Sequence, residues 1–514
     1  MPRFPKFSLL LVLWATGAPA AETVASSVLS SITATDLRRH AERLADDTLE
    51  GREAGSRGGQ AAGHYLGREF QRHQLAGGVA SRSYYQTFGS QYRNLLGLLE
   101  GSDPQLQKEV ILVGAHYDHV GYGNAQNSYG PTGYIHNGAD DNASGVAGLL
   151  ELVEAFSRLE ARPKRSILFA LWDGEEKGLL GSEHWVAHPT VPLDRVRLAI
   201  NLDMIGRLQR NRVETFGIRS GYGLRRLISL NNADTDLAFD FSWTMREDSD
   251  HYSFYKRSVP VLMFHTGLHS DYHRPSDDVE KLDFPGMERI VRLLFGVVYD
   301  AATEPRMLGF RPASKKETSE TQQQRERRSP PPPGRLGIVW EGADEGQGSG
   351  LRVVQVTPES AAARAGVRVG DRLLRFAGHD LGRQDVTVDL RGLVLAARNP
   401  VTITVARSGI AQPLDLTVQL AGEPVRLGVS WRTDDAEPQA VVVTRVVPGS
   451  PAAQAGIQVN DRLYQVSGQP FTGEAEFRRL VSEVEGDTLD LVAERQGRIR
   501  TVSVRLLPSV GMEF

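Results

Sequence analysis

Cysteine is absent from the 514 residues of the chain. Disulfide bonds therefore cannot stabilise the fold, and a lipid-modified cysteine cannot anchor the chain to a membrane. Thiolate metal ligands and a cysteine nucleophile are excluded for the same reason. Any metal site in this protein must use histidine, aspartate and glutamate side chains.

Long hydrophobic runs are scarce, and the one at the start of the chain is short. After Ser8, residues 9–14 are all apolar. The cationic segment 1–7 comes before this run, and the sequence Ala18-Pro-Ala20 follows it. This pattern predicts a signal peptide over residues 1–20, cleaved after Ala20. The run falls short of the roughly 20 residues that a membrane span needs. We therefore expect an exported protein, periplasmic or secreted, without a membrane span.

A large excess of charge is also lacking, because the formal net charge is −4. A general nucleic-acid-binding protein would be basic, so this balance argues against nucleic-acid partners. Hydrophobic residues make up 40% of the chain, which is typical of a soluble globular protein. The length predicts two to four domains at about 100–200 residues per domain.

The first domain, expected over residues 33–306, has the alternating strands and helices of an α/β fold. Apolar runs that predict buried strands occupy residues 109–115, 166–172, 197–202 and 259–264, and residues 145–156 have helical periodicity. This alternation predicts a doubly wound, mainly parallel sheet. Ligands of such sheets bind beyond the carboxyl ends of the strands.

Two repeats follow a segment of different composition. Residues 315–328 contain no apolar residue and residues 330–333 are all proline, so we expect a disordered Pro-rich linker over residues 311–334. The motif of residues 356–373 then recurs at residues 447–463. The repeat predicts two small β-rich domains, residues 335–421 and 425–508.

Ionisable side chains gather at the predicted carboxyl ends of the strands. Imidazoles and carboxylates on one rim are what zinc binds when thiolates are missing. Five ligands serve two zinc ions only if one carboxylate bridges them, and Asp140, in a sharp turn, is the expected bridge. The residues concerned are His116, Asp140, Glu175, Glu176, Asp203 and His273.

Each of these residues alone has a simpler interpretation. Asp140 could cap a helix, a single histidine could form a local hydrogen bond, and Glu175 with Glu176 could form a solvated face. Their occurrence at five separate strand ends favours a metal centre. Adjacent glutamates in a turn point in different directions, so one could bind metal while the other reaches a water molecule. The residues alone do not say which glutamate does which.

Five motifs in this order resemble those of a known enzyme family. They are Ala-His116-Tyr-Asp118-His, Gly-Ala-Asp140-Asp-Asn-Ala-Ser-Gly, Trp-Asp-Gly-Glu175-Glu176-Lys-Gly-Leu-Leu-Gly-Ser, Asn-Leu-Asp203-Met-Ile-Gly and Asp-Tyr-His273. Through them, residues 35–305 resemble the secreted di-zinc aminopeptidases of clan MH, of the bacterial and yeast vacuolar type.

The resemblance implies a role for each residue. One zinc ion would bind His116, Asp140 and Asp203, and the other would bind Asp140, Glu176 and His273. Glu175 would be the general base for a metal-bridging water, and Asp118 would orient His116. Tyr272 stands where some relatives have a tyrosine that stabilises the oxyanion. Asp141 could replace Asp140 as the bridge through a slip of one residue, although the family register favours Asp140.

Other polar residues near the rim are interpreted more simply. We expect a structural role for the cluster Ser249-Asp250-His251 and assign it no metal. Four more histidines are interpreted as local hydrogen-bonding residues that narrow the cleft: His119, His136, His265 and His269.

The two C-terminal repeats resemble PDZ domains of the bacterial protease type. The carboxylate-binding loop of that family corresponds to Leu336-Gly337-Ile338 in the first repeat and Leu427-Gly428-Val429 in the second. The resemblance implies that a peptide adds a strand at the sheet edge with its terminal carboxylate in this loop. The alternative is a spacer or an oligomerisation module. A Gly-rich insertion at residues 342–350 weakens the first repeat as a binder.

Together these features predict a zinc exopeptidase that removes N-terminal residues from peptides, using a metal-bridged water activated by a glutamate. PDZ modules would recruit peptide or protein partners. Carboxypeptidase-type cleavage, glutaminyl-cyclase-like activity and an inactive PDZ scaffold are the alternatives. The intact ligand set argues against the last two, whereas the preference for the amino end rests on the family resemblance alone.

Overall fold

A computed structural model describes residues 28–80, 82–307, 309–328, 334–341, 350–381, 389–484 and 486–507. The expected signal peptide lies outside this range, and so do residues 342–349 of the Gly-rich insertion. The chain divides into two compact units. One comprises residues 1–322 with residues 496–498, and the other comprises residues 323–495 and 499–514.

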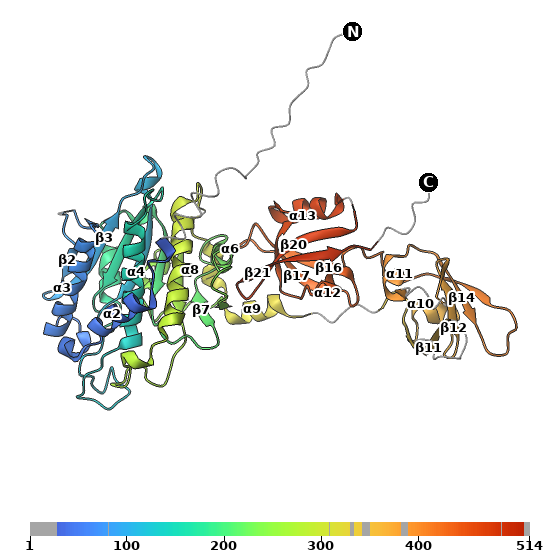
Figure 1. The fold of residues 1–514 in the computed structure, drawn as a ribbon, viewed down its shortest axis with the longest axis horizontal. Helices are drawn as coiled ribbons and strands as arrows, with labels where there is room; N and C mark the ends of the chain where they lie inside the picture. The colour runs from blue at the N-terminus through green and yellow to red at the C-terminus, as the bar shows by residue number, and fades with distance from the viewer. Residues whose placement is uncertain are drawn as a thin grey trace, which may run out of the picture. The chain divides into compact units, whose positions relative to one another are not determined.

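The first unit is built on a nine-stranded mixed sheet with the order β1-β3-β5-β4-β6-β9-β7-β8, and β2 pairs with β3 (Figure 1). The central strands β5, β4, β6 and β9 are parallel neighbours. On one side of them, β3 pairs antiparallel with β5, and β1 and β2 pair antiparallel with β3. On the other side, β7 pairs antiparallel with β9. The α/β fold predicted from the sequence is confirmed, with antiparallel pairing added towards the edges. The strands are β1 (Ala76–Gly77), β2 (Tyr85–Phe88), β3 (Tyr92–Leu99), β4 (Val110–His116), β5 (Ser166–Trp172), β6 (Val196–Leu202), β7 (Arg212–Phe216), β8 (Ala238–Phe241) and β9 (Val261–His265).

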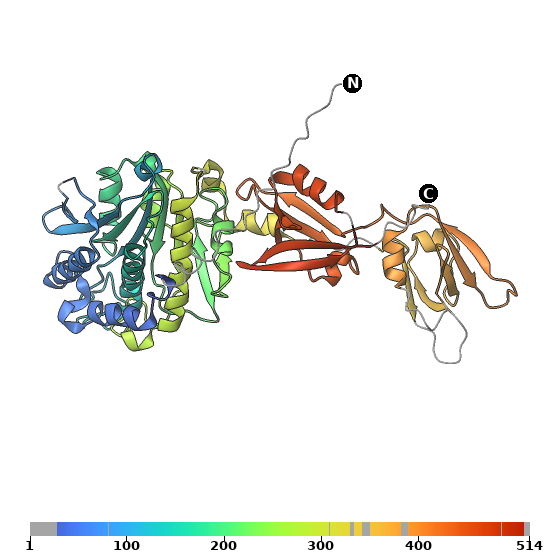
Figure 2. The same cartoon turned by 45° about the horizontal axis from the view of Figure 1, so that its top comes forward.

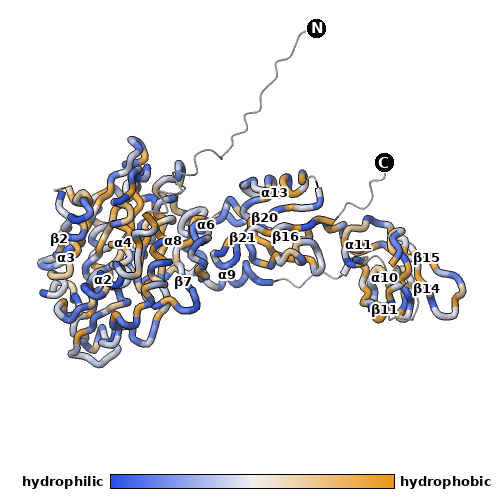
Figure 3. Tube along the Cα trace, viewed as in Figure 1, coloured by the Kyte–Doolittle hydropathy of each residue, from blue (hydrophilic) through white to orange (hydrophobic). Residues whose placement is uncertain are grey.

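Helices cover both faces of this sheet (Figure 2). Alternate residues of the central strands point to opposite faces, so Ile111 and Phe169 join a core with α2, α4 and α8, whereas Leu112 and Trp172 join a second core with α5 and α7. In Figure 3 the hydrophobic stretches run through the interior, and the exposed helix α9 is hydrophilic. The helices are α2 (Ala34–Leu44), α3 (Arg57–Arg72), α4 (Gly145–Ser157), α5 (Leu180–Ala187), α6 (Leu224–Leu230), α7 (His251–Lys256), α8 (Phe284–Thr303) and α9 (Ser319–Glu326).

Part of the expected disordered linker is folded. Residues Pro312–Lys316 form a short helical turn, and α9 follows it. The carboxylate of Glu317 receives hydrogen bonds of 2.7 and 2.8 Å from Arg219 and from Arg311, whose side chains are both buried. Composition predicted disorder because the segment lacks apolar residues, but these paired charges attach it to the first unit. Residues 329–333, which include the proline run, lie outside the described residues.

The second unit contains two β-rich domains of the same topology. The first sheet has the order β10-β11-β12-β14-β15 and the second has the order β16-β17-β18-β20-β21, each with a short extra strand, and every pair is antiparallel. The first repeat contains β10 (Ile338–Glu341), β11 (Leu351–Val356), α10 (Ala361–Arg364), β12 (Arg372–Phe376), β13 (His379–Asp380), α11 (Leu390–Ala396), β14 (Val401–Ala406) and β15 (Leu414–Val418). The second contains β16 (Val429–Thr433), β17 (Val441–Val446), α12 (Pro451–Gln454), β18 (Arg462–Val466), β19 (Gln469–Pro470), α13 (Gly473–Ser482), β20 (Thr488–Arg495) and β21 (Arg498–Arg505).

A search of the described residues finds no helix that combines the length and the hydrophobicity of a membrane span.

Candidate metal centre

The centre lies where three neighbouring parallel strands end. Strand β4 ends at His116 and pairs with β5 on one side and β6 on the other. The chain continues from β5 to Glu175 and Glu176, and from β6 to Asp203. Because parallel strands present their carboxyl ends at the same edge, these side chains converge there. His273 reaches the same edge from the loop after β9.

Two groups of buried or nearly buried side chains at this edge could each hold a metal ion. In the first group, His116 Nε2 lies 3.3 Å from Asp141 Oδ1 and 3.4 Å from Asp203 Oδ1. One ligand atom from each of these residues lies within 4.8 Å of the other two. An imidazole and two carboxylates form a donor set that zinc accepts.

The second group shares Asp141 with the first. His119 Nδ1 lies 2.7 Å from Glu176 Oε1 and 3.8 Å from Asp141 Oδ2, and these three residues meet the same distance criterion. His273 Nε2 lies 3.2 Å from Asp141 Oδ2 and 3.2 Å from Glu176 Oε2. Asp141 therefore directs Oδ1 to the first group and Oδ2 to the second.

Asp140, the expected bridge, faces away from both groups. Its Oδ1 accepts hydrogen bonds from Gly206 N at 2.7 Å and Ser144 Oγ at 2.9 Å, and its Oδ2 lies 3.2 Å from His269 Nε2. A Cβ atom at Gly206 would lie 2.8 Å from Asp140 Oδ1, so this close approach requires glycine. The turn η3 (Ala139–Ser144) kinks at Asp141, with φ −103° and ψ 93°, and the two adjacent carboxylates diverge. The geometry therefore favours Asp141, rather than the expected Asp140, as the residue between the two groups.

His119 is a second difference from the sequence interpretation. It was interpreted as a local hydrogen-bonding residue, yet its buried imidazole belongs to the second group. Its position three residues after His116 is the one signal in the sequence, and it becomes informative only once the loop after β4 is known.

Glu175 lines the same cleft as these groups but belongs to neither of them. Burial raises the pKa of its carboxyl well above the usual value, and the neighbouring charges of Glu176 and Asp250 raise it further. Its backbone N–H donates to Asp118 Oδ1 at 3.1 Å. Asp118 Oδ1 also lies 3.8 Å from His116 Nδ1, so Asp118 contacts both the expected base and an expected ligand.

The histidines and carboxylates of the centre perturb one another strongly. Burial lowers the pKa of His273, but contacts with Asp141 and Glu176 outweigh burial and raise it to about 10. Burial raises the pKa of Asp141, but His116 and His273 outweigh burial and hold it well below its usual range. The gathered carboxylates therefore favour positive charge at this edge, which a bound metal cation would supply.

Hydrogen bonds fix the loops that carry the centre. Asp277 Oδ2 accepts the backbone N–H groups of Asp140 and Asp141 at 2.9 and 3.1 Å. Ser249 Oγ donates to Asp203 Oδ2 at 2.6 Å and in turn accepts from Asn201 Nδ2 at 2.8 Å. Ser249 thus has a structural contact with a member of the first group.

The cleft itself is narrow, with a cavity volume of about 50 Å³. The ring of Tyr272 stacks on that of His273 with the centroids 4.0 Å apart. The guanidinium of Arg246 lies 3.7 Å from the carboxylate of Asp248. The cleft is lined by His116, Asp141, Glu175, Glu176, Asp203, Met204, Arg246, Asp248, Met263, His265, Leu268 and Tyr272.

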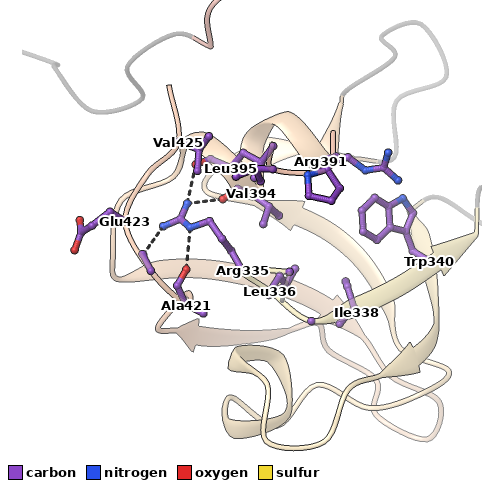
Figure 4. A pocket seen from close by; sticks show the side chains of 15 residues that line it. Arg335, Leu336, Ile338, Trp340, Arg391, Val394, Leu395, Ala421, Glu423 and Val425 are labelled. Atoms are coloured by element: carbon purple, nitrogen blue, oxygen red, sulfur yellow. Dashed lines mark hydrogen bonds between the residues drawn. The ribbon is translucent and has the colours of Figure 1, made fainter. Parts of the chain in front are cut away.

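A second, larger cavity of about 580 Å³ lies beside β10 and α11 of the first repeat, and Val447 and Pro448 of the second repeat also line it (Figure 4). Its walls include the apolar side chains of Leu336, Ile338, Trp340 and Val394. Arg335 donates to the carbonyls of Val394, Leu395 and Ala397 at 2.6–2.9 Å and so secures the C-terminal end of α11.

The corresponding tryptophan of the second repeat has aromatic and cationic neighbours. Trp431 packs edge-on against Phe477 of α13 with the ring centroids 4.9 Å apart. The Arg478 guanidinium lies 5.4 Å from the Trp431 ring centroid. Trp431 is therefore partly buried against side chains of α13.

Comparison with known proteins matches residues 94–298 to Peptidase family M28, and residues 352–407 and 442–495 to the PDZ domain. Leupeptin-inactivating enzyme 1 of Streptomyces exfoliatus is 29% identical over 38% of this chain and 42% of its own length. Aminopeptidase YwaD of Bacillus subtilis is 27% identical over 42% of this chain and 46% of its own length. The chain thus spans less than half the length of each of these two relatives.

Two further similarities were found. The regulator of sigma-E protease RseP of Escherichia coli is 34% identical over 31% of this chain and 36% of its own length. The crystal structure of the LapA aminopeptidase of Legionella pneumophila is similar with a TM-score of 0.45 and 20% identity, covering 56% of this chain and 76% of that one. The family matches identify the enzymatic part of the molecule: this chain carries a metallopeptidase domain of peptidase family M28, followed by two PDZ domains.

Proposed function

We propose that this protein is an aminopeptidase that uses two zinc ions to remove N-terminal residues from peptides. The observation that carries the proposal is the position of Asp141, whose two carboxylate oxygens face two different metal-binding groups. One ion would be held by His116, Asp141 and Asp203. The other would be held by Asp141, Glu176 and His273, with His119 beside Glu176.

The donor chemistry fits zinc. All candidate ligand atoms are imidazole nitrogens or carboxylate oxygens, and three carboxylates are gathered at the edge of one sheet with histidines between them. Once bound, zinc ions would supply Lewis-acid chemistry, polarising the scissile carbonyl and making a water molecule more acidic.

Glu175 supplies the proton transfer. Its carboxylate is buried in the cleft and outside both metal groups, so it is available to take a proton from the attacking water and return it to the leaving amine. Burial raises the pKa of its carboxyl, and the charges of Glu176 and Asp250 raise it further. Asp118 holds the Glu175 backbone through its N–H group.

The phenolic O–H of Tyr272 can donate a hydrogen bond to the substrate carbonyl oxygen, which becomes negatively charged when water attacks the carbonyl carbon. Burial raises the pKa of this phenol, and the charges of Asp141 and Glu176 raise it further, which keeps the group protonated. Its ring lines the cleft and stacks on His273.

The cleft favours cleavage at the amino end. Its cavity of about 50 Å³ is too small for an extended chain to pass through. The guanidinium of Arg246, with which a free α-carboxylate could otherwise pair, lies 3.7 Å from the carboxylate of Asp248. A free α-amine is therefore better accommodated than a free α-carboxylate, which a carboxypeptidase would have to bind.

The PDZ domains would recruit peptides, and the first repeat is the better candidate. Its cavity beside β10 and α11 can take an apolar C-terminal side chain while the peptide backbone pairs with β10. The loop residues Leu336, Gly337 and Ile338 would hold the terminal carboxylate through their N–H groups. The corresponding loop of the second repeat contains Leu427, Gly428 and Val429. Trp431, which follows this loop, packs against Phe477 of α13. We further propose export to the periplasm or the medium, on the strength of residues 1–20.

One experiment tests the main proposal. Metal content is measured on the purified protein, and hydrolysis is measured on peptides with a free N-terminus, a blocked N-terminus or a blocked C-terminus. The proposal expects two zinc ions per chain, cleavage of N-terminally free peptides whether or not the C-terminus is blocked, and no cleavage of N-blocked peptides. Cleavage that requires a free C-terminus would show a carboxypeptidase instead.

A further inference from the structure

Three exposed tyrosines lie on one loop of the peptidase domain. In residues 120–136, Tyr122, Tyr129 and Tyr134 expose 48%, 64% and 62% of their surface. Exposed aromatic side chains grouped near a cleft are typical of a binding surface. The three differ in what they contact, and this difference identifies the one that faces substrate.

Tyr129 is fixed beside the metal centre by the backbone. Its N–H donates to the carbonyl of His273 at 3.0 Å, and Arg274 Nη1 donates to the carbonyl of Gly130 at 3.0 Å. The neighbouring Ser128 hydroxyl lies 2.7 Å from His136 Nε2 within the same loop. The loop is therefore attached to the segment that carries His273.

Aromatic rings continue from this loop into the cleft. The ring centroid of Tyr129 lies 5.8 Å from that of Tyr272 and 6.0 Å from that of His273. Tyr272 lines the cleft, whereas Tyr129 is mainly exposed. We call Tyr129 and Tyr272 the aromatic shelf. Leu268, which is 60% exposed, also lines the cleft and places apolar surface at its mouth.

We propose that the aromatic shelf binds the side chain of the residue that follows the scissile bond and favours a large apolar or aromatic side chain there. This inference rests on the proposed aminopeptidase function. The narrow cavity takes the N-terminal residue, so the rest of the peptide must leave through the open mouth of the cleft. The exposed ring of Tyr129 meets the first side chain on that path.

The expected size of this preference follows from ring packing. An aromatic contact contributes about 0.5–1.5 kcal/mol beyond the burial of area. Because about 1.4 kcal/mol corresponds to a tenfold change, the shelf should favour phenylalanine over glycine by roughly threefold to tenfold.

The test measures kcat/KM for peptides that share one N-terminal residue and carry Gly, Ala, Leu or Phe after it. In Tyr129→Ala, the ratio of Phe to Gly should fall by about threefold to tenfold, while Tyr129→Phe should keep it. Tyr134→Ala is the matched control, because Tyr134 is as exposed on the same loop, and it should keep the ratio. An unchanged ratio in Tyr129→Ala, or an equal fall in Tyr134→Ala, overturns the proposal.

A binding measurement separates this inference from the proposed reaction. With the zinc-loaded Glu175→Gln protein, the Kd of the same uncleaved peptides should show the preference for Phe over Gly, and the added Tyr129→Ala change should remove it. Equal Kd values for the two peptides in the Glu175→Gln background overturn the shelf even if hydrolysis is normal. A clear preference for Phe, lost with Tyr129→Ala, supports the shelf even if hydrolysis at the amino end is not found.

Discussion

The carboxylate of Asp277 accepts the backbone N–H of Asp141 through Oδ2 at a distance of 3.1 Å. The same oxygen accepts the N–H of Asp140 at 2.9 Å. Both side chains are buried, so this contact fixes the turn whose kink aims Asp141 at the two metal-binding groups. Asp277, which belongs to neither candidate metal-binding group, thus helps to determine where the Asp141 carboxylate points.

Asp277→Ala should therefore weaken metal binding without removing a ligand. Loss of groups that orient metal ligands typically costs about 10–100-fold in affinity or activity. Zinc affinity, measured by competition with a chelator, should fall in that range. Asp278→Ala is the control, because the adjacent Asp278 contacts Asn137 and not the turn backbone, and it should keep zinc affinity. Equal affinities in the two variants would contradict a positioning role for Asp277.

Glu175→Gln should retain zinc and lose hydrolysis. General-base catalysis contributes about 10²–10⁴-fold to such reactions, and the amide cannot take a proton. The measurements are the zinc content and the kcat of the variant on a fixed peptide. Most of the activity surviving in a zinc-loaded Glu175→Gln protein would reject the role assigned to this carboxylate.

Removal of residues 335–514 should leave hydrolysis of short amino-acid amides close to that of the full chain. The peptidase domain and the two PDZ domains have separate hydrophobic cores, and all candidate metal ligands belong to the first unit. Recruitment of longer partners should be lost with the PDZ domains. A truncated protein that is folded and zinc-loaded but inactive on amides would show that catalysis depends on the repeats.

Stability should depend on pH through Glu151, a fully buried residue of α4. Burial raises its pKa to about 8. Between about pH 4.5 and 8 the folded state keeps a proton that the unfolded state has released, so the free energy of unfolding falls as pH rises. Glu151→Gln does not titrate and keeps an oxygen for the Thr33 N–H that Glu151 accepts.

The variant should therefore gain stability relative to the original protein as pH rises through this window, by at most about 1.4 kcal/mol per pH unit. Denaturant unfolding at pH 5, 7 and 9 measures the difference. The imidazole of His40 lies 3.7 Å from Glu151, and burial lowers its pKa to about 3. This account would be contradicted if the free energies of unfolding of the original protein and of Glu151→Gln differed by the same amount at all three pH values.

The sequence predicted the fold of the peptidase domain well because its central strands are continuous apolar runs. The expected strand at residues 166–172 coincides with β5, and the expected helix at residues 145–156 differs from α4 by one residue. Apolar periodicity determines such elements locally. Strand β7, which pairs antiparallel with β9, was not predicted, because the charged Arg212 and Glu214 interrupt its apolar residues.

The site was harder to predict because it depends on the directions of side chains in loops. Asp140 and Asp141 are adjacent and chemically identical, and only the kink in η3 separates their orientations. His119 joins the second group through the conformation of the loop after β4. Asp277 accepts a hydrogen bond from a backbone N–H 136 residues away, so no local sequence pattern predicts its role.

The central claim is that Asp141, rather than its neighbour, is shared by the two metal-binding groups. The most direct measurement is the zinc content of Asp141→Asn and Asp140→Asn after equal exposure to zinc and dialysis. We predict that Asp141→Asn retains less than one ion per chain and no hydrolysis. Asp140→Asn, whose amide oxygen can still accept from Gly206, should retain two ions. Two ions in Asp141→Asn together with their loss from Asp140→Asn would contradict the account.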